Sequence, residues 1–239
     1  MAATDLAPPF ILFGPAHLAA LILSVAIPLL LALWSRRNAA RDHVVRMCLA
    51  VLLIAGWLGW YAMLWARGWL AAGNALPLNL CDWAQGALII ALLSRNRRAY
   101  ELGYFWGLGG TLQGVITPDV PSGFPDLQFL LFMLDHAGLI AVLLYLTWGS
   151  GMRPVASSLP RVILATLVYV AVAAIADYAL GTNYGFLRGK GDHVSLLTFL
   201  APWPWYIGEL VVIGLASVAV YYAPFWLLDR FKRPKTSTS

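Results

Sequence analysis

The chain has 239 residues, of which 61% are hydrophobic and 11% charged, and its mean hydropathy is +0.74. This composition is typical of a polytopic membrane protein and excludes a water-soluble globular fold. The net charge of +5 comes from short basic connections and not from a basic groove with interleaved aromatic side chains, so no nucleic-acid partner is expected.

Seven apolar runs follow one another along the chain, each close to the 20 or so residues that cross a bilayer as a helix. We predict helices at about 16–34, 44–66, 76–94, 99–117, 127–148, 160–180 and 204–228. The fold class is therefore all-α, a single seven-helix transmembrane bundle over residues 1–239 with a disordered tail at 230–239. Such a chain is an integral membrane protein, and in a bacterium it belongs to the cytoplasmic (inner) membrane.

Lysine and arginine predict the orientation of the bundle. Of the 16 basic residues, all but Arg67, Arg188 and Lys190 lie in the segments after the first, third, fifth and seventh helices. Because basic connections stay in the cytoplasm, we expect the N-terminus outside and the C-terminus in the cytoplasm.

With this orientation, polar side chains from several helices fall in the outer half of the membrane. A titratable side chain in hydrocarbon costs several kcal/mol, so it usually faces the bundle interior and has a function. Structural polar residues are expected to scatter along the membrane normal, so the shared depth favours a site. The residues concerned are Asn79, Cys81, Asp82 and Gln85 of the third helix, Gln113 of the fourth, His136 of the fifth, Asp177 and Asn183 at the end of the sixth, and Glu209 of the seventh.

Cys81 and His136 are the most informative members of this set. A thiol and an imidazole that meet form a nucleophile and its base. Cys48 lies toward the opposite side of the membrane, so we expect no disulfide and a free thiol at Cys81, about one and a half turns inside its helix. Neighbours on a helix point about 100° apart, so Asp135 is not expected to orient His136. Taken singly, a buried Cys or His is also compatible with simple packing.

Two segments are each compatible with two interpretations: the glycine cluster from Gly107 to Gly110 and the outer connection from Gly181 to Trp205. The glycines are compatible with a phosphate cradle, but in an apolar run we expect a close helix contact. A connection of this length is often a lid or a binding segment, and a solvated re-entry loop is equally compatible with its composition.

Four stretches carry a resemblance to a known family: LPLNLCDW (Leu76–Trp83), YELGYFWGLGGTLQGVITPD (Tyr100–Asp119), LDHAG (Leu134–Gly138), and NYGFLRGK with LAPWPWY (Asn183–Tyr206). With them the chain resembles the YwaF-type integral membrane family, which also contains the animal transmembrane protein 164. The resemblance implies a cysteine-dependent acyltransferase that moves a fatty acyl chain onto a lysophospholipid. It assigns the nucleophile to Cys81 and the base to His136.

Residues and resemblance together lead to one main hypothesis and two alternatives. The main one is a membrane-embedded acyltransferase or lipid acyl-ester hydrolase that takes phospholipid or fatty-acyl ester substrates from the outer leaflet, without metal or cofactor. Asn79, Asp82, Gln113, Asp177, Asn183 and Glu209 then bind substrate or support the pair. One alternative is a seven-helix carrier or receptor that binds a proton or small ligand at the same polar cluster; the other is a structural assembly protein. No predicted span contains Lys, which excludes a retinal Schiff base.

Overall fold

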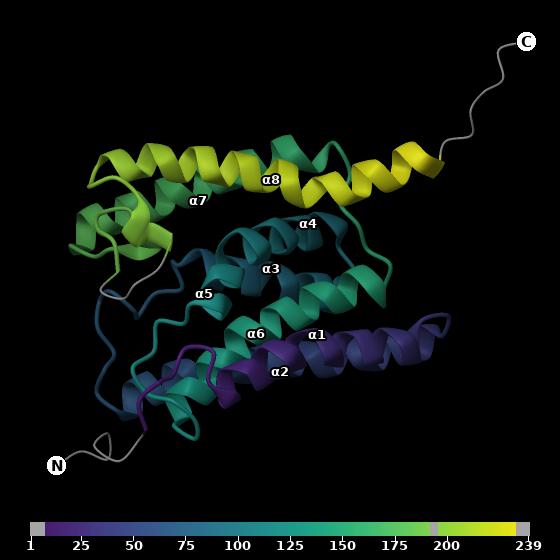
Figure 1. Ribbon diagram of the computed structural model, residues 1–239, viewed down its shortest axis with the longest axis horizontal. Helices are drawn as coiled ribbons and strands as arrows, with labels where there is room; N and C mark the ends of the chain where they lie inside the picture. Colours follow the sequence, from purple (N-terminus) through teal and green to yellow (C-terminus); the bar gives the residue numbers. More distant parts are fainter. Residues whose placement is uncertain (1–7, 192–195, 233–239) are drawn as a thin grey trace, which may run out of the picture.

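The computed structural model of the protein describes residues 8–191 and 196–232, and Figure 1 shows them as a bundle of helices. The elements are α1 (Pro15–Ser35), α2 (Ala39–Ala66), α3 (Leu80–Ser94), α4 (Arg97–Trp106), the π-helical η2 (Gly107–Thr111), α5 (Leu112–Ile116), α6 (Leu127–Trp148), α7 (Ser158–Leu180) and α8 (Trp205–Lys232), with short 3₁₀ turns η3 (Tyr184–Phe186) and η4 (Leu196–Phe199). Because α4, η2 and α5 follow without a break, the described residues form seven long helical segments, as predicted.

Five of these helices, α1, α2, α6, α7 and α8, are long and apolar enough to cross a membrane in the described part of the chain. The helix α3 is also apolar but has only 15 residues. A chain with several such helices is a polytopic integral membrane protein, which confirms the predicted class.

The helix boundaries differ from the predicted ones where capping competes with hydropathy. The third helix begins at Leu80 and not at 76, because the residue before Pro77 is disfavoured in a helix and Asn79 forms the N-cap. The second begins at Ala39, five residues before the predicted start, because the Asn38 side chain accepts the N–H of Arg41 at 3.0 Å. The first turns of this second helix contain charged residues, so a search for apolar runs does not detect where the helix begins.

The C-terminal helix is longer than predicted. Helix α8 continues to Lys232, so the first three residues of the predicted disordered tail are helical. The rest of that tail, 233–239, and residues 192–195 of the long connection lie outside the described residues.

Glycines shape the middle of the bundle at η2. A Cβ on Gly110 would lie 3.0 Å from the Leu80 side chain, and one on Gly107 would lie 3.1 Å from Leu143. The lack of side chains there lets α3 and α6 approach closely, and the π-helical turn is the kind of local distortion that often accompanies a site. The predicted close helix contact is confirmed.

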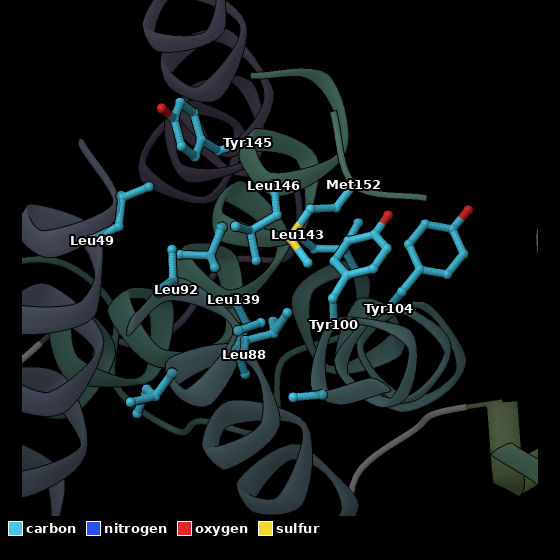
Figure 2. Packing of buried hydrophobic residues seen from close by; sticks show 14 of the residues in the cluster. Leu49, Leu88, Leu92, Tyr100, Tyr104, Leu139, Leu143, Tyr145, Leu146 and Met152 are labelled. Atoms are coloured by element: carbon cyan, nitrogen blue, oxygen red, sulfur yellow. The ribbon is translucent and has the colours of Figure 1, made fainter. Parts of the chain in front are cut away.

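The hydrophobic core joins α3, α4 and α6. Figure 2 shows its leucines and tyrosines interdigitated between these helices. Its members include Leu88, Leu92, Tyr100, Tyr104, Leu139, Leu143, Tyr145, Leu146 and Met152. Helices α1 and α2 pack on α6 at one side, and α7 and α8 form a separate layer at the other (Figure 1). The most apolar stretch of α8 has no buried residue, so most of its surface is available to lipid.

One end of the bundle, which we call the basic end, is where α3 finishes and α4 and α7 begin. Ion pairs hold it together: Asp42 with Arg46 and Arg95, Glu101 with Arg97 and Arg161, and Arg153 with Asp229. The opposite end is called the Cys81 end. There Arg67 pairs with Asp126 at 3.0 Å, and the segment before α1 reaches the loop before α6 through an isolated bridge between Pro9 and Ser122.

Candidate functional site

Cys81 occupies the first turn of α3, nearer the helix end than predicted because the helix begins at Leu80. Asn79 precedes this turn, and its backbone N–H donates to the Asp82 carboxylate at 3.0 Å. The first N–H groups of a helix have no acceptor within it, and they favour negative charge nearby. The thiol is therefore next to backbone donors at the end of a helix.

Acidic and phenolic groups surround the Cys81 thiol. The carboxyl groups of Asp82 and Asp135 are close enough to interact with it electrostatically. The hydroxyls of Tyr61 on α2 and Tyr169 on α7 interact with both Cys81 and Asp82. The Tyr169 hydroxyl is buried and has no hydrogen-bond partner among the described residues, so it has a free donor at the site.

Asp135 is a buried carboxyl that joins three helices. Gln85 of α3 donates from Nε2 to the Leu53 carbonyl of α2 at 3.0 Å and to Asp135 Oδ1 at 3.3 Å. A Cβ on Gly56 would lie 2.6 Å from Asp135 Oδ1, so only glycine leaves room for the carboxylate. These contacts hold the Asp135 carboxylate against α2 and α3.

His136 lies against α5 with one ring nitrogen available. Its Nδ1 is 3.1 Å from the Phe132 carbonyl, and its ring stacks on that of Phe132 at 4.0 Å. A carbonyl only accepts, so Nδ1 carries the proton in this contact and Nε2 keeps a free lone pair. A Cβ on Gly114 would lie 2.9 Å from the ring Cδ2 and 3.5 Å from Nε2, so the ring fits only because position 114 is glycine.

The helices that carry Cys81 and His136 both pack against the glycine-containing segment η2–α5. Leu80 of α3, the neighbour of Cys81, contacts Gly110, and the His136 ring on α6 contacts Gly114. Gly110 and Gly114 are four residues apart in the sequence. Among the described residues no hydrogen bond joins the thiol to the ring.

Asp177 and Asn183 organise the long connection. Asp177 Oδ1 accepts the hydroxyl of Thr182 and the N–H of Tyr184, both at 2.7 Å, and its Oδ2 is buried without a partner among the described residues. Asn183 Nδ2 donates to the Gly189 carbonyl at 2.9 Å. Both residues shape the segment up to residue 191.

This connection reaches the site through Tyr184 and Gly185. The Tyr184 hydroxyl donates to the Ala72 carbonyl at 2.5 Å and accepts the Leu76 N–H at 3.1 Å. The N–H of Gly185 donates to Asn79 Oδ1 at 3.4 Å, and a Cβ at Gly185 would lie 2.5 Å from the Tyr169 hydroxyl. The segment therefore covers the start of α3.

Gln113 and Glu209 stand apart from these contacts. Within the described chain the Gln113 side chain makes no hydrogen bond, although it lies beside Gly114. Glu209 is exposed on α8 and accepts the N–H of Ala201 at 2.9 Å. The carrier hypothesis requires one cluster that contains His136, Asp177 and Glu209. In the structure these three side chains have separate hydrogen-bond partners.

The sequence interpretation missed the aromatic half of the site. Three aromatic residues line the site: Tyr61, Trp57 and Tyr169. In the sequence they look like ordinary interface or packing aromatics, and their spacing does not distinguish them from the other aromatic residues. Trp57 Nε1 is buried next to the Asp82 carboxyl group and the Tyr61 hydroxyl. Among the described residues no three His, Cys, Asp or Glu side chains gather in a way that could hold a metal ion.

Comparison with known families matches residues 12–222 to the TMEM164 family. The match covers most of the 239 residues, and the chain belongs to this family. No curated protein and no solved structure matches the chain.

Proposed function

We propose that this member of the TMEM164 family is a membrane-embedded, cysteine-dependent acyltransferase for lipid esters. The observation that supports the proposal is that the helices of Cys81 and His136 pack against the same segment, with Leu80 at Gly110 and the His136 ring at Gly114, while Nε2 of His136 stays free. The family resemblance of the motifs around both residues supports the same pair. Hydrolysis differs only in the acceptor, since water then replaces the lipid alcohol.

The chemistry proceeds in two balanced steps. His136 Nε2 takes the thiol proton of Cys81, and the thiolate attacks the ester carbonyl of the donor lipid. The C–O bond then breaks, the acyl group stays on sulfur as a thioester, and the imidazolium returns its proton to the leaving alkoxide. In the second step His136 deprotonates the acceptor alcohol, which attacks the thioester and restores the thiol.

The surrounding groups have supporting roles in this proposal. The tetrahedral intermediate carries a negative oxygen, and in the proposal backbone N–H groups at the start of α3 and the Tyr169 hydroxyl bind it. The Gln85–Asp135 pair holds α2, α3 and α6 together around the thiol. The distance between thiol and ring tightens only with substrate bound, as is common for catalytic hydrogen bonds.

The proposal places this site in the outer half of the membrane. The basic end carries most of the arginines, so the proposal puts it in the cytoplasm and the Cys81 end outside. Reporter fusions at Lys190 and Ser239 test this directly. A reporter that works only in the cytoplasm should be silent at Lys190 and active at Ser239, and the reverse pattern refutes the placement.

Trapping of the acyl thioester tests the chemistry. The protein in detergent is incubated with phospholipids that carry a labelled acyl chain, and bound label is then released with hydroxylamine. We expect label on the wild-type chain and on Cys48→Ser, and none on Cys81→Ser. The Cys48 variant is the matched control, because both cysteines are free and Cys48 is exposed on α2.

His136→Ala separates catalysis from simple reactivity. The variant should slow label transfer by about 10²-fold or more, the usual contribution of a general base, and a lysophospholipid should discharge the thioester of the wild-type protein. Label that persists on Cys81→Ser refutes the proposal. Absence of label on every variant across phospholipids of different head groups also contradicts it and favours the carrier hypothesis.

A further inference from the structure

An apolar groove runs between α3, α4 and α7, away from the Cys81 site. Its volume is about 610 Å³, within the usual range for a ligand site. Ten of its lining residues are uncharged and one is an arginine: Trp83, Gly86, Ala87, Ile90, Ala99, Leu102, Trp106, Leu164, Ala165 and Val168, with Arg161.

The groove opens to the surroundings of the bundle. Ile90, Leu164 and Val168 along its walls are 53%, 64% and 52% exposed, so the apolar surface faces lipid. Aromatic rings close the end nearer the middle of the bundle, where Trp83 lies 6.1 Å from Trp106 and 5.4 Å from Tyr169. Arg161 marks the other end, and from there to Val168 the helix rises about 10 Å.

Positive charge at the basic end is not balanced by the protein. Glu101 is buried and pairs with both Arg97 and Arg161, so two guanidinium groups share one carboxylate. Arg161 has five N–H donors, of which one bonds Glu101 and one bonds the Ser157 hydroxyl. Its Nε–H is buried without a partner among the described residues, so the donors left for a ligand are the second N–H groups of its two Nη atoms. This arrangement complements an anion with several acceptor oxygens.

From these observations we infer a binding site for an anionic phospholipid of the leaflet at the basic end, with one acyl chain in the groove and the phosphate at Arg161. The apolar walls match an acyl chain, and the excess charge matches the head group. An uncharged partner would leave the second guanidinium without a counter-ion. A basic residue near a membrane surface favours anionic lipid by about fivefold.

This site is separate from the acyl-transfer site. Trp83, Gly86, Ala87 and Ile90 share one face of α3, and at 100° per residue Cys81 lies on the opposite face. A lipid in the groove therefore does not reach the thiol along α3. The inference stands whether or not Cys81 is a nucleophile, because its test involves no thioester.

Gly86 offers a variant that fills the groove without disturbing the fold. A Cβ at Gly86 meets nothing within 4 Å, so Gly86→Leu places its side chain in open space. Gly214→Leu is the matched control, since a Cβ at Gly214 on α8 also meets nothing within 4 Å and lies outside the groove. Arg161→Gln removes the charge and leaves Glu101 paired with Arg97, and Arg36→Gln removes an exposed charge at the end of α1.

Native mass spectrometry of the whole protein in detergent measures binding of the first lipid. The probes are phosphatidylglycerol and phosphatidylcholine with identical acyl chains. For the wild-type protein we expect about fivefold tighter binding of phosphatidylglycerol. Arg161→Gln should abolish this preference, and Gly86→Leu should weaken binding of both lipids. Gly214→Leu and Arg36→Gln should behave as the wild-type protein.

Three results overturn the inference. Equal affinity of the wild-type protein for the two lipids removes the role of charge. Unchanged binding to Gly86→Leu places the lipid elsewhere on the bundle. If Arg36→Gln loses the preference for phosphatidylglycerol as fully as Arg161→Gln does, the preference comes from general surface charge and not from Arg161.

Discussion

The contact between Gly56 and Asp135 allows a quantitative test of the helix packing around Cys81. In Gly56→Ala, the new Cβ would lie 2.6 Å from Asp135 Oδ1, whereas ordinary contacts begin at 3.4 Å. The carboxylate must therefore move by about 0.8 Å, the difference between these distances. Its hydrogen bond from Gln85, already 3.3 Å long, does not survive such a shift.

The expected loss follows from two opposing effects. A buried acceptor left without its partner costs about 1 to 3 kcal/mol, while alanine in a helix interior gains up to about 1 kcal/mol over glycine. With the full gain of about 1 kcal/mol, the net change is a destabilisation of up to about 2 kcal/mol. Gly86→Ala, with open space at its Cβ, should instead gain up to about 1 kcal/mol.

Thermal unfolding in detergent, followed by tryptophan fluorescence, measures this difference. For a chain of this size 1 kcal/mol shifts the midpoint by roughly 2 to 4 °C, so Gly56→Ala should melt several degrees below Gly86→Ala. In the Asp135→Ala background the clash with the carboxylate is absent, and the remaining contact at 3.2 Å is with the flexible Leu134 side chain, so Gly56→Ala should then cost little. Equal midpoints for the two glycine variants, or an unchanged cost in the double variant, refute the packing argument.

Two further predictions address the base and the ion pair at the Cys81 end. Gly114→Ala displaces the His136 ring and should slow formation of the acyl thioester by about tenfold, whereas Gly109→Ala, whose Cβ meets nothing within 4 Å, should not change the rate. Burial raises the pKa of Asp126, but the Arg67 guanidinium and backbone N–H groups more than offset this, so its pKa lies below the usual value. The ion pair thus stabilises the fold above the unfolded pKa of about 3.9, and this stabilisation is lost as the pH falls through the lower pKa of the folded state. Thermal unfolding midpoints measured from pH 6 to pH 3 should therefore fall less steeply in Arg67→Gln than in the wild-type protein. Parallel curves of midpoint against pH for the two proteins contradict this assignment.

Run length and charge distribution predict the helices of this protein because both follow from the membrane itself. Each apolar run must satisfy its backbone within a helix, which leaves little choice of structure. Boundaries were predicted poorly where a polar cap extends or shortens a helix, as at Asn38 and Asn79. The pattern does not detect these ends, since hydropathy ignores hydrogen bonds to the first turn.

The polar part of the site was predictable and the aromatic part was not. Cys81 stands out in the sequence because a thiol beside a carboxyl in an apolar run is unusual. Tyr169 and Tyr61 do not, since tyrosines have many roles in membrane proteins and only the packing of α7 and α2 brings these two to α3. The depth of Asp177 predicts a supporting role, and its bonds from Thr182 and Tyr184 show that its carboxylate also shapes a loop, which the sequence pattern does not reveal.

The position of α7 connects the two proposed lipid sites. This helix meets α4 through the Arg161–Glu101 ion pair and the bond from Trp106 Nε1 to Thr166 Oγ1 at 2.9 Å. Beyond the groove it presents Tyr169 to Cys81. A lipid in the groove adds packing between α7 and α3 beyond the contact of Trp83 with Tyr169, and rigid support of this kind improves the placement of a catalytic donor. Such support predicts that phosphatidylglycerol speeds thioester formation in the wild-type protein and not in Gly86→Leu; an equal response of both proteins would mean that the two sites act independently.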